Sequence, residues 1–386
     1  MNKLTFSLIL LLFPLQAACE REQESIPPSD KIAKAQGWKK ETVVAGLENP
    51  WSMAWLPDGS MLITERPGRI RRFKDGVLGK ESLSGIPKVL SSGQGGLLDI
   101  SLHPKFSENN LLYFTYAAGT ADSNRTTLAR ARLSGGALED VRTIWENPDV
   151  KPGTQHFGSR ITWLDDGTLL MSVGDGGNPP TELNGGLIRR YAQDRSKAFG
   201  KILRLKDDGS IPADNPFAEK ENERGEIYSY GHRNIQGLVF DSATKRVWAN
   251  EHGSRGGDEL NLIERGQNYG WPLASYSMEY FGGPVARVKS SPEFKDPKLV
   301  WTPSPAPSGI TVYTGNRFPQ WKGDLLSGNL AGKHVRRIDL DGDRVLGEEA
   351  LDIGKRVRDV RVGPDGELYL LTDEGNGELL RIVPAS

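Results

Sequence analysis

The sequence predicts an all-β protein, a six-bladed β-propeller built from four-stranded antiparallel blades. First, a unit of turn residues, a short apolar strand and a Gly/Asp/Glu-rich break recurs six times along the 386 residues. Second, the copies lie about 45 to 80 residues apart, near or above the ~40–50 residues of a four-stranded blade. Third, 45 glycines and a hydrophobic content of 37% suit a turn-rich β protein. One such unit cannot bury its own apolar face, so six are expected to close into a ring.

The six copies follow one another from the N-terminal to the C-terminal part of the chain. They are PDGSMLITER from Pro57, HPKFSENNLLYFTYAAG from His103, DDGTLLMSVGDGG from Asp165, DSATKRVWANEHG from Asp241, FPQWKGDLLSGNLAG from Phe318 and PDGELYLLTDEG from Pro364. The alternating segment WKKETVVAGLENPWSMAWL is expected to start the first blade. The final GELLRIV is expected to pair with the N-terminal strands, which would remove an exposed sheet edge. The long insertions 177–199 and 276–300 are predicted to be functional loops.

The N-terminus has the pattern of an export signal over residues 1–18. Lys3 supplies positive charge, and the apolar run Leu4–Leu15 is too short to span the ~30 Å core of a bilayer. The single cysteine, Cys19, follows two alanines, as the acylated cysteine of a bacterial lipoprotein does, although Gln16 stands where that signal usually has leucine. Either Cys19 carries a lipid or it is an incidental residue near a cleavage site.

The remaining chain divides into two parts. Residues 19–37 are polar and lack periodicity, which predicts a flexible tether, and residues 38–386 are predicted to form the propeller domain. The expected location is therefore periplasmic, or the outer membrane if Cys19 is acylated, and one cysteine allows no internal disulfide. A net charge of −1 gives no electrostatic reason to expect nucleic acid, or a membrane surface other than through such an anchor.

The chain has only five histidines, so each can be considered as a candidate catalytic group. His103 lies in a turn and is predicted to be structural, while His334 lies in a charged hairpin and is predicted to be solvated. His156, in TQHFGSR, and His232, in YGHRNIQG, each neighbour a glycine near the start of a blade, so either could be catalytic. Asp175, in VGDGG, either caps its own turn or orients His156 and raises its basicity.

Two further patterns point to bound ions. The stretch EHGSRGGDELNLIERGQNYGW supplies Asp258, Glu259 and loop carbonyls, which are the oxygen ligands that Ca²⁺ takes, although it lacks EF-hand spacing and could be a solvated acidic loop. Arg356 and Arg358 share one strand face by alternation, and two adjacent guanidinium groups repel unless an anion lies between them. The pair therefore predicts a polyanionic ligand, unless both arginines pair with carboxylates such as Asp352 or Asp359.

These motifs together resemble the soluble glucose/sorbosone dehydrogenases that depend on pyrroloquinoline quinone (PQQ), and within them the bacterial aldose sugar dehydrogenases. The resemblance runs through nearly the whole mature chain. It is carried, in family order, by SSGQGGLLDI, TQHFGSR, VGDGG, YGHRNIQG, GGDELN, NYGWP and KRVRDVRVGPDG. It implies a six-bladed propeller that uses PQQ and Ca²⁺ to oxidise aldose sugars at C1 to the lactone.

The resemblance also implies roles for individual residues. His156 matches the general base, Asp175 the carboxylate that orients it, and Arg233 the group that stabilises charge on the quinone. The implied cofactor contacts are Gln94, Arg233, Asn234, Tyr280, Asn329, Leu330, Ala331, Arg356, Val357 and Arg358. The implied calcium ligands are the carbonyls of Gly253 and Ser254 for the cofactor's ion, and Glu259 with the carbonyl of Tyr269 for a structural ion, with Asp258 nearby.

One position departs from the family pattern. Some members carry a cofactor lysine where this chain has Ala331. Lys333 lies two residues on, and even spacing places it on the same strand face, from which it could replace that lysine. The expected partners are an aldose sugar and an electron acceptor (a quinone, a dye or a cytochrome), with the chain a monomer or weak dimer.

Two other functions fit the same architecture. A calcium-dependent propeller lactonase would use the axial metal without a redox cofactor, and an exported binding propeller would have no catalytic groups. Addition of PQQ and Ca²⁺ to cofactor-free protein separates them, because only the dehydrogenase would gain dye-reducing activity.

Overall fold

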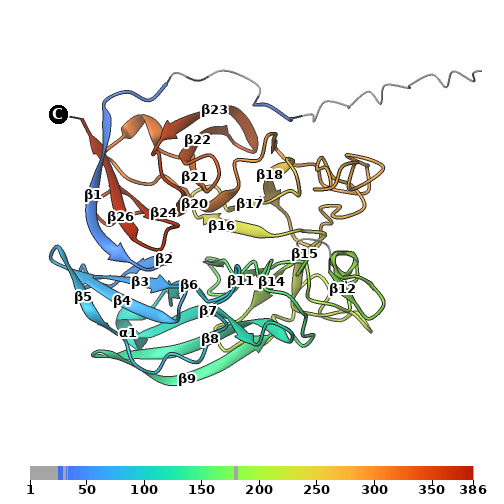
Figure 1. The fold of residues 1–386 in the computed structure, drawn as a ribbon, viewed down its shortest axis with the longest axis horizontal. Coiled ribbons are helices and arrows are strands. Elements are labelled where there is room, and N and C mark those ends of the chain that lie inside the picture. The colour runs from blue at the N-terminus through green and yellow to red at the C-terminus, as the bar shows by residue number, and fades with distance from the viewer. Residues whose placement is uncertain (1–24, 29–31, 33, 178–180, 386) are drawn as a thin grey trace, which may run out of the picture.

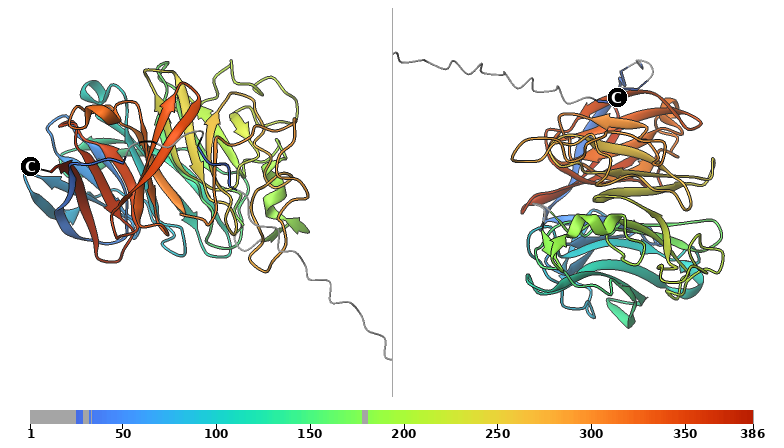
Figure 2. Two further views of the ribbon diagram at one scale, coloured as in Figure 1. Left: turned by 90° about the horizontal axis from the view of Figure 1, so that it is seen from above. Right: turned by 90° about the vertical axis from the view of Figure 1, so that its right-hand side faces the viewer.

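Six four-stranded antiparallel sheets make up the body of the molecule (Figures 1 and 2). The computed structural model describes residues 25–28, 32, 34–177 and 181–385. The innermost strands of neighbouring sheets contact one another in sequence all the way round, from the first sheet to the sixth and back to the first. The protein is therefore a six-bladed β-propeller, as the sequence predicts.

The blades follow the chain, and each runs from an innermost to an outermost strand. Blade 1 contains β2 (Pro50–Trp55), β3 (Met61–Glu65), β4 (Arg69–Lys74) and β5 (Val77–Ser82); blade 2 contains β6 (Leu97–Leu102), β7 (Leu111–Gly119), β8 (Asn124–Ser134) and β9 (Ala137–Glu146); blade 3 contains β10 (Ile161–Trp163), β11 (Leu169–Val173), β14 (Lys201–Leu205) and β15 (Ile227–Tyr230). Blade 4 contains β16 (Ile235–Asp241), β17 (Arg246–Glu251), β18 (Asp258–Ile263) and β19 (Leu299–Trp301); blade 5 contains β20 (Pro307–Val312), β21 (Leu325–Asn329), β22 (His334–Asp341) and β23 (Arg344–Asp352); blade 6 contains β24 (Val357–Val362), β25 (Leu368–Thr372), β26 (Gly377–Pro384) and β1 (Trp38–Leu47).

Short elements complete the described chain. They are α1 (Phe106–Asn109), β12 (Glu182–Leu183), β13 (Gly186–Leu187) and the 3-10 helices η1 (Ile188–Ala192) and η2 (Pro319–Trp321). None of the helices in the described ranges is long and apolar enough to cross a membrane.

The ring closes through the two ends of the chain. Strand β1 pairs antiparallel with β26, in a register that runs from Trp38 opposite Pro384 to Leu47 opposite Gly377. The predicted pairing of the last strand is thus confirmed. The prediction that the whole N-terminal alternating segment starts blade 1 is wrong: its first half is the outer strand of blade 6, and only β2 belongs to blade 1. Alternation identified two strands but could not show that they lie in different sheets.

The hydrophobic core lies between adjacent blades. Strands β3, β11, β14 and β21 are buried at every residue, because both of their faces are covered by neighbouring sheets. One cluster joins Leu62 and Ile70 of blade 1 to Leu112 and Phe114 of blade 2. Such inter-blade packing makes the ring a rigid support for side chains at its mouth.

The segment that precedes the propeller lies along two of its blades where the structure describes it. Ile26 forms a β-bridge with Val300 at the edge of blade 4, and the Ala35 N–H donates to Glu349 of blade 5 over 2.7 Å. The predicted signal peptide and Cys19 lie outside the described residues, so export, acylation and the tether's flexibility stay predictions.

Candidate active site

A pocket opens at one mouth of the propeller, where each blade's innermost strand begins and its second strand ends. Antiparallel pairing brings these two positions to the same edge of each sheet. Gln94 and Arg356 precede innermost strands, whereas Leu330 and Asp373 follow second strands directly. The pocket has a volume of about 300 Å³. Its lining residues are Trp51, Arg66, Gly93, Gln94, Leu98, Phe157, Gly158, Gln236, His252, Ala306, Leu330, Arg356, Arg358 and Asp373.

His156 and Asp175 form a buried pair beside this pocket. The His156 Nδ1 lies 2.6 Å from Asp175 Oδ1, and Asp175 Oδ2 accepts the indole N–H of Trp271 over 2.8 Å. A carboxylate beside Nδ1 favours the tautomer with the proton on Nδ1, which leaves Nε2 as a proton acceptor. Nε2 is buried and has no hydrogen-bond partner in the described part of the chain. The predicted role of Asp175 in orienting His156 therefore has the required geometry.

Local backbone geometry holds the imidazole in place. His156 has a φ of +51°, and its N–H donates to Gln94 Oε1 over 2.9 Å. Gly174 passes so close that a Cβ there would lie 2.2 Å from the His156 carbonyl oxygen. Only glycine fits at this point, so the VGDGG motif carries both the carboxylate and the close approach that it needs.

The electrostatics of the site keep His156 neutral. Burial, followed by the positive charge of Arg233, lowers the pKa of His156 to about 4, and the nearby Asp175 opposes this only in part. Burial likewise lowers the pKa of His252 to about 3. A neutral imidazole can accept a proton at pH 7, although a pKa of about 4 makes it a weaker base than an exposed histidine.

Arg233 and Asn234 add unpaired polar groups to the same region. The Arg233 Nη1 donates to the His252 carbonyl over 3.0 Å and its guanidinium lies over the Trp271 ring. Among the described residues, Arg233 Nε and Asn234 Nδ2 are buried without partners. Each buried unsatisfied group costs about 1–3 kcal/mol, so their convergence with His156 Nε2 indicates a ligand that would complete them.

The opposite side of the pocket is strongly positive. Arg356 and Arg358 both pair with a carboxylate, as the alternative expected, but the partner is Asp373, at 2.9 and 3.1 Å, and not Asp352 or Asp359. Burial alone would raise the pKa of Asp373, but the two arginines outweigh it and lower that pKa. The lining holds three arginines, the third being Arg66, against one carboxylate, a formal charge of +2. This excess suits the predicted polyanionic ligand.

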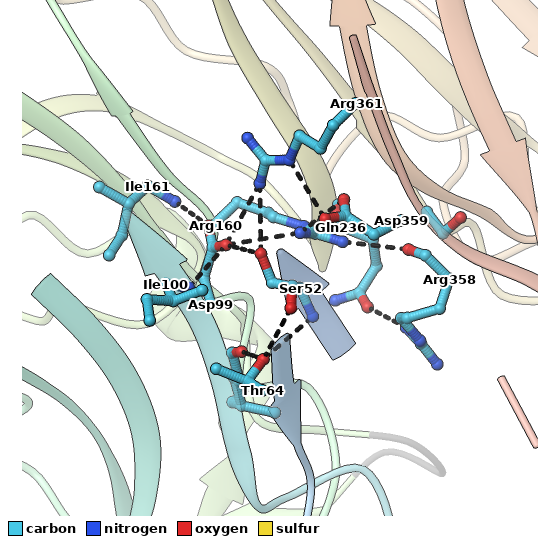
Figure 3. Close-up of polar contacts among 12 residues, drawn as sticks. Ser52, Thr64, Asp99, Ile100, Arg160, Ile161, Gln236, Arg358, Asp359 and Arg361 are labelled. Atoms are coloured by element: carbon cyan, nitrogen blue, oxygen red, sulfur yellow. Dashed lines mark hydrogen bonds and ion pairs between the residues drawn. The ribbon is translucent and has the colours of Figure 1, made fainter. Parts of the chain in front are cut away.

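A separate network of charged side chains lies on the propeller axis, next to the pocket residue Arg358 (Figure 3). Arg160 Nη1 lies 2.9 Å from Asp359, and Arg361 lies 3.1 Å from Asp359 and 3.3 Å from Asp99. Arg160 also donates to the Arg358 carbonyl over 3.1 Å. Two guanidinium groups thus face two carboxylates, so this cluster is electrically balanced.

The predicted calcium residues lie together at the end of blade 4, but in different states. Asp258 accepts hydrogen bonds from the N–H groups of Gly253 and Ala306, over 2.7 and 2.9 Å, so it holds the loop rather than standing free. Burial raises its pKa to about 6. The N–H of Ser254 donates to Ser277.

Glu259 is the better candidate ligand of this group. It lies opposite Glu251 in the β17–β18 register, and burial together with Glu251 raises the pKa of Glu259 to about 8. Tyr269 lines the same small cavity. Two buried facing carboxylates fit a cation. No group of three or more His, Cys, Asp or Glu side chains in the described ranges is arranged to hold a metal.

Several predicted cofactor contacts lie elsewhere. Tyr280 is 51% exposed and does not line the pocket. The Val357 side chain packs in the core, so only its backbone could face a ligand. Asn329 is buried and donates to the Ser327 carbonyl over 3.0 Å.

The expected exchange of Ala331 for Lys333 is not supported by the strand geometry. Strand β21 ends at Asn329 and β22 begins at His334, so Ala331 and Lys333 lie in the intervening turn and share no strand face. Both residues are exposed. Residues two apart share a face only where the backbone is extended, and the backbone between β21 and β22 turns.

The remaining histidines are explained by their contacts. His232 lies between Glu251 and Ser229, at 3.1 and 2.9 Å, and stacks on Tyr269, so its ring nitrogens are occupied. His103 accepts the Lys105 N–H in a turn, as predicted. His334 is half-buried and bonds to the Gly332 carbonyl, rather than being fully solvated.

Trp51, Arg66, His252 and Asp373 are among the pocket residues that were not predicted from the sequence. Arg66, His252 and Asp373 directly follow the second strand of their blades, as the predicted Gly/Asp/Glu-rich break does. That repeated position was the signal that could have identified them.

A six-bladed propeller with a buried imidazole–carboxylate pair and a cationic pocket at its mouth has the organisation of a propeller enzyme that acts on a small molecule. The model of the Glucose / Sorbosone dehydrogenase family matches residues 47–381, and the chain belongs to this family.

Relatives extend over nearly the whole chain. An uncharacterized protein of Synechocystis sp. is 52% identical, over 93% of this chain and 91% of its own length. The aldose sugar dehydrogenase YliI of Escherichia coli is 41% identical, over 88% of this chain and 91% of its own. The PQQ-bound aldose sugar dehydrogenase of Streptomyces coelicolor has a similar structure, with a TM-score of 0.72 and 30% identity, over 91% of this chain and 99% of that one. These relatives support an oxidoreductase that acts on sugars.

Proposed function

We propose that this protein oxidises aldose sugars at C1 to the lactone with PQQ and Ca²⁺. The observation that carries the proposal is the pocket itself. Its lining carries a charge of +2. His156, Arg233 and Asn234, which have buried polar atoms without partners, are hydrogen-bonded to the lining residues Gln94, His252 and Gly158. A planar quinone with several carboxylates would neutralise the excess positive charge and provide hydrogen-bond partners for the unpaired polar atoms.

The residues present fit such a cofactor. Arg356 and Arg358 would bind its carboxylates, and Arg233 with Asn234 would donate to its quinone oxygens. When bound, PQQ supplies the two-electron acceptor for the hydride that leaves C1 of the sugar. Preorganised donors such as Arg233 would stabilise developing negative charge at no reorganisation cost.

The chain's own part in the chemistry is proton removal. His156 Nε2 would accept the C1 hydroxyl proton as the C–H pair of electrons departs and the carbonyl of the lactone forms. Asp175 would hold the Nδ1 proton and stabilise the imidazolium, and Trp271 would fix Asp175 through the indole N–H. A polyanion near Arg233 would offset its positive charge and raise the pKa of His156 toward the range of an effective base.

Calcium would serve two places at the end of blade 4. The Gly253 and Ser254 carbonyls would hold the ion at the cofactor, and Glu259 with the Tyr269 carbonyl would hold a structural ion. The raised pKa of Glu259 supports the second place, because a divalent cation would relieve the repulsion from Glu251.

The proposed setting rests on the sequence, above all on its N-terminal pattern. The protein would be exported to the periplasm, anchored by lipid if Cys19 is acylated, and monomeric or weakly dimeric. It would pass electrons to a quinone, a dye or a cytochrome.

Reconstitution tests the proposal. Cofactor-free protein loaded with Ca²⁺ is titrated with PQQ in a calorimeter, then assayed with a panel of aldoses and an artificial dye. We expect saturable heat and dye reduction that requires both PQQ and an aldose. Absence of heat, or hydrolysis of lactones by the same material without PQQ, would reject the dehydrogenase in favour of a hydrolase.

A further inference from the structure

Arg66 is a pocket residue whose environment differs from that of the other two arginines. It lies in the turn directly after β3 of blade 1 and lines the pocket together with Arg356 and Arg358 of blade 6. Within the described residues, no carboxylate oxygen forms an ion pair with it, whereas Arg356 and Arg358 share Asp373. Arg66 therefore contributes a positive charge that the protein does not neutralise.

The positive charge of Arg66 is repelled by that of Arg358. Burial, followed by the positive charge of Arg358, lowers the pKa of Arg66, and the attraction of Asp373 opposes this only in part. Two guanidinium groups that repel each other across a pocket cost stability unless an anion lies between them. The arrangement is explained if Arg66 and Arg358 bind the same anionic ligand.

Arg66 also forms hydrogen bonds with the loop that carries Gln94. Its Nε donates to the Gly95 carbonyl over 3.2 Å and its Nη2 donates to the Gly93 carbonyl. Nη1 donates to no acceptor in the described part of the chain, so it is available to a ligand in the pocket. The planar fork of arginine allows one side chain to bind protein and ligand together.

The same loop contacts His156 of the proposed catalytic pair. Gln94 Oε1 accepts the N–H of His156, whose φ of +51° requires external support. A continuous set of contacts thus runs from Arg66 through the loop to His156. The cationic side of the pocket and the residue that bears the imidazole are thus joined through one loop, by hydrogen bonds that each pair a side chain with a main-chain group.

We propose that Arg66 is a third anion-binding residue, which binds a carboxylate of the cofactor, and that it positions the Gln94 loop against His156. The inference rests on the proposed function, since the anion in question is PQQ. It assigns the anion site to blade 1 as well as blade 6, so the ligand would bridge two adjacent blades.

The test compares Arg66 variants with a matched arginine of the same hairpin. Calcium-loaded, cofactor-free wild type, R66Q, R66K and R69Q are titrated with PQQ in a calorimeter at several salt concentrations. Arg69 is the control because it pairs with Glu48 and Glu65 and does not line the pocket. Loss of a charge-assisted hydrogen bond should weaken PQQ binding about ten- to a hundredfold in R66Q.

The salt dependence of PQQ affinity distinguishes the charge of Arg66 from its hydrogen bonds to the Gln94 loop. R66Q should show a shallower decrease of affinity with salt, because one screened attraction is missing, whereas R66K should keep the wild-type slope. R66K should bind several-fold more weakly than wild type, because an ammonium group cannot replace the fork. R69Q should match wild type in both readouts.

The outcomes are distinct. If wild type itself fails to bind PQQ, the proposed function is wrong and Arg66 needs another ligand. If wild type binds and R66Q binds equally tightly with the same salt dependence, the role of Arg66 is refuted. Should R66Q fail to fold, R66K decides alone, and wild-type affinity in R66K would refute the inference.

Discussion

Two clusters of charge lie next to each other at the centre of this propeller, one on the axis and one at the pocket, and they differ in how their charges are satisfied. In the axial network, Arg160 and Arg361 face Asp99 and Asp359 (Figure 3). In the pocket, three arginines face only Asp373. A main-chain contact, the donation from Arg160 to the Arg358 carbonyl, joins the two clusters.

The difference teaches how structural and ligand-binding charges can be told apart. Buried charges that are paired and hydrogen-bonded hold a fold together, because removal of either partner leaves the other uncompensated. Charges in excess that line a pocket, beside buried polar atoms without partners, have no structural reason to persist unless a ligand completes them. By this criterion the axis is structural and the mouth is functional.

The largest expected effect is on the axis. Arg160→Met should lower the free energy of unfolding by about 3–5 kcal/mol, because it leaves two buried carboxylates with one guanidinium. Denaturant unfolding followed by circular dichroism measures the change. Arg132→Gln is the control, since Arg132 forms exposed ion pairs with Glu139 and Asp140, and should cost about 0–1 kcal/mol. Similar losses in the two variants would remove the distinction between axis and surface.

Substitution of His156 should lower the reaction rate. His156→Gln is expected to lower kcat of the reconstituted enzyme by at least ~10², while PQQ affinity stays close to that of wild type. Steady-state dye reduction and calorimetry on the same preparation measure the two quantities. His334→Gln, which alters a histidine outside the pocket, should keep wild-type kcat. An unchanged kcat in His156→Gln would eliminate this imidazole as the base.

A smaller effect is expected from the indole that supports Asp175. Trp271→Phe keeps an aromatic ring but removes the N–H donor of Asp175 Oδ2, so kcat should fall about tenfold. Trp163→Phe is the matched control, because its indole N–H donates to Ser101 away from the pocket. Equal kcat values for both variants and wild type would show that Asp175 needs no such support.

The smallest expected effect is a pH dependence of stability. The pKa of His156 is lowered in the folded state from its ordinary 6.5 to about 4, so the unfolded chain binds more protons between these values. The contribution of His156 to stability is therefore complete above about pH 6.5 and is lost as the pH falls toward about 4. Unfolding midpoints from pH 4 to 7 should vary less steeply in His156→Gln than in wild type. Identical slopes would mean that His156 is not buried as a neutral group.

The sequence predicted the core of the active site because motifs retain local geometry. The VGDGG motif placed Asp175 beside a close glycine turn, and YGHRNIQG placed Arg233 and Asn234 at a blade edge. The prediction for Lys333 failed because it depended on the backbone conformation. Alternation applies to strands, whereas Lys333 lies in a turn.

From the sequence alone, the number of blades and a candidate pair of His156 and Asp175 could be predicted, because repeated turns and periodicity are visible over short stretches of chain. Only the tertiary structure decided which charges balance. Arg160 forms an ion pair with Asp359, and Arg66 lines the same pocket as Arg358, although the two residues of each pair are far apart in the chain. The sign and surplus of a buried cluster depend on distances between blades, and no local pattern encodes those distances.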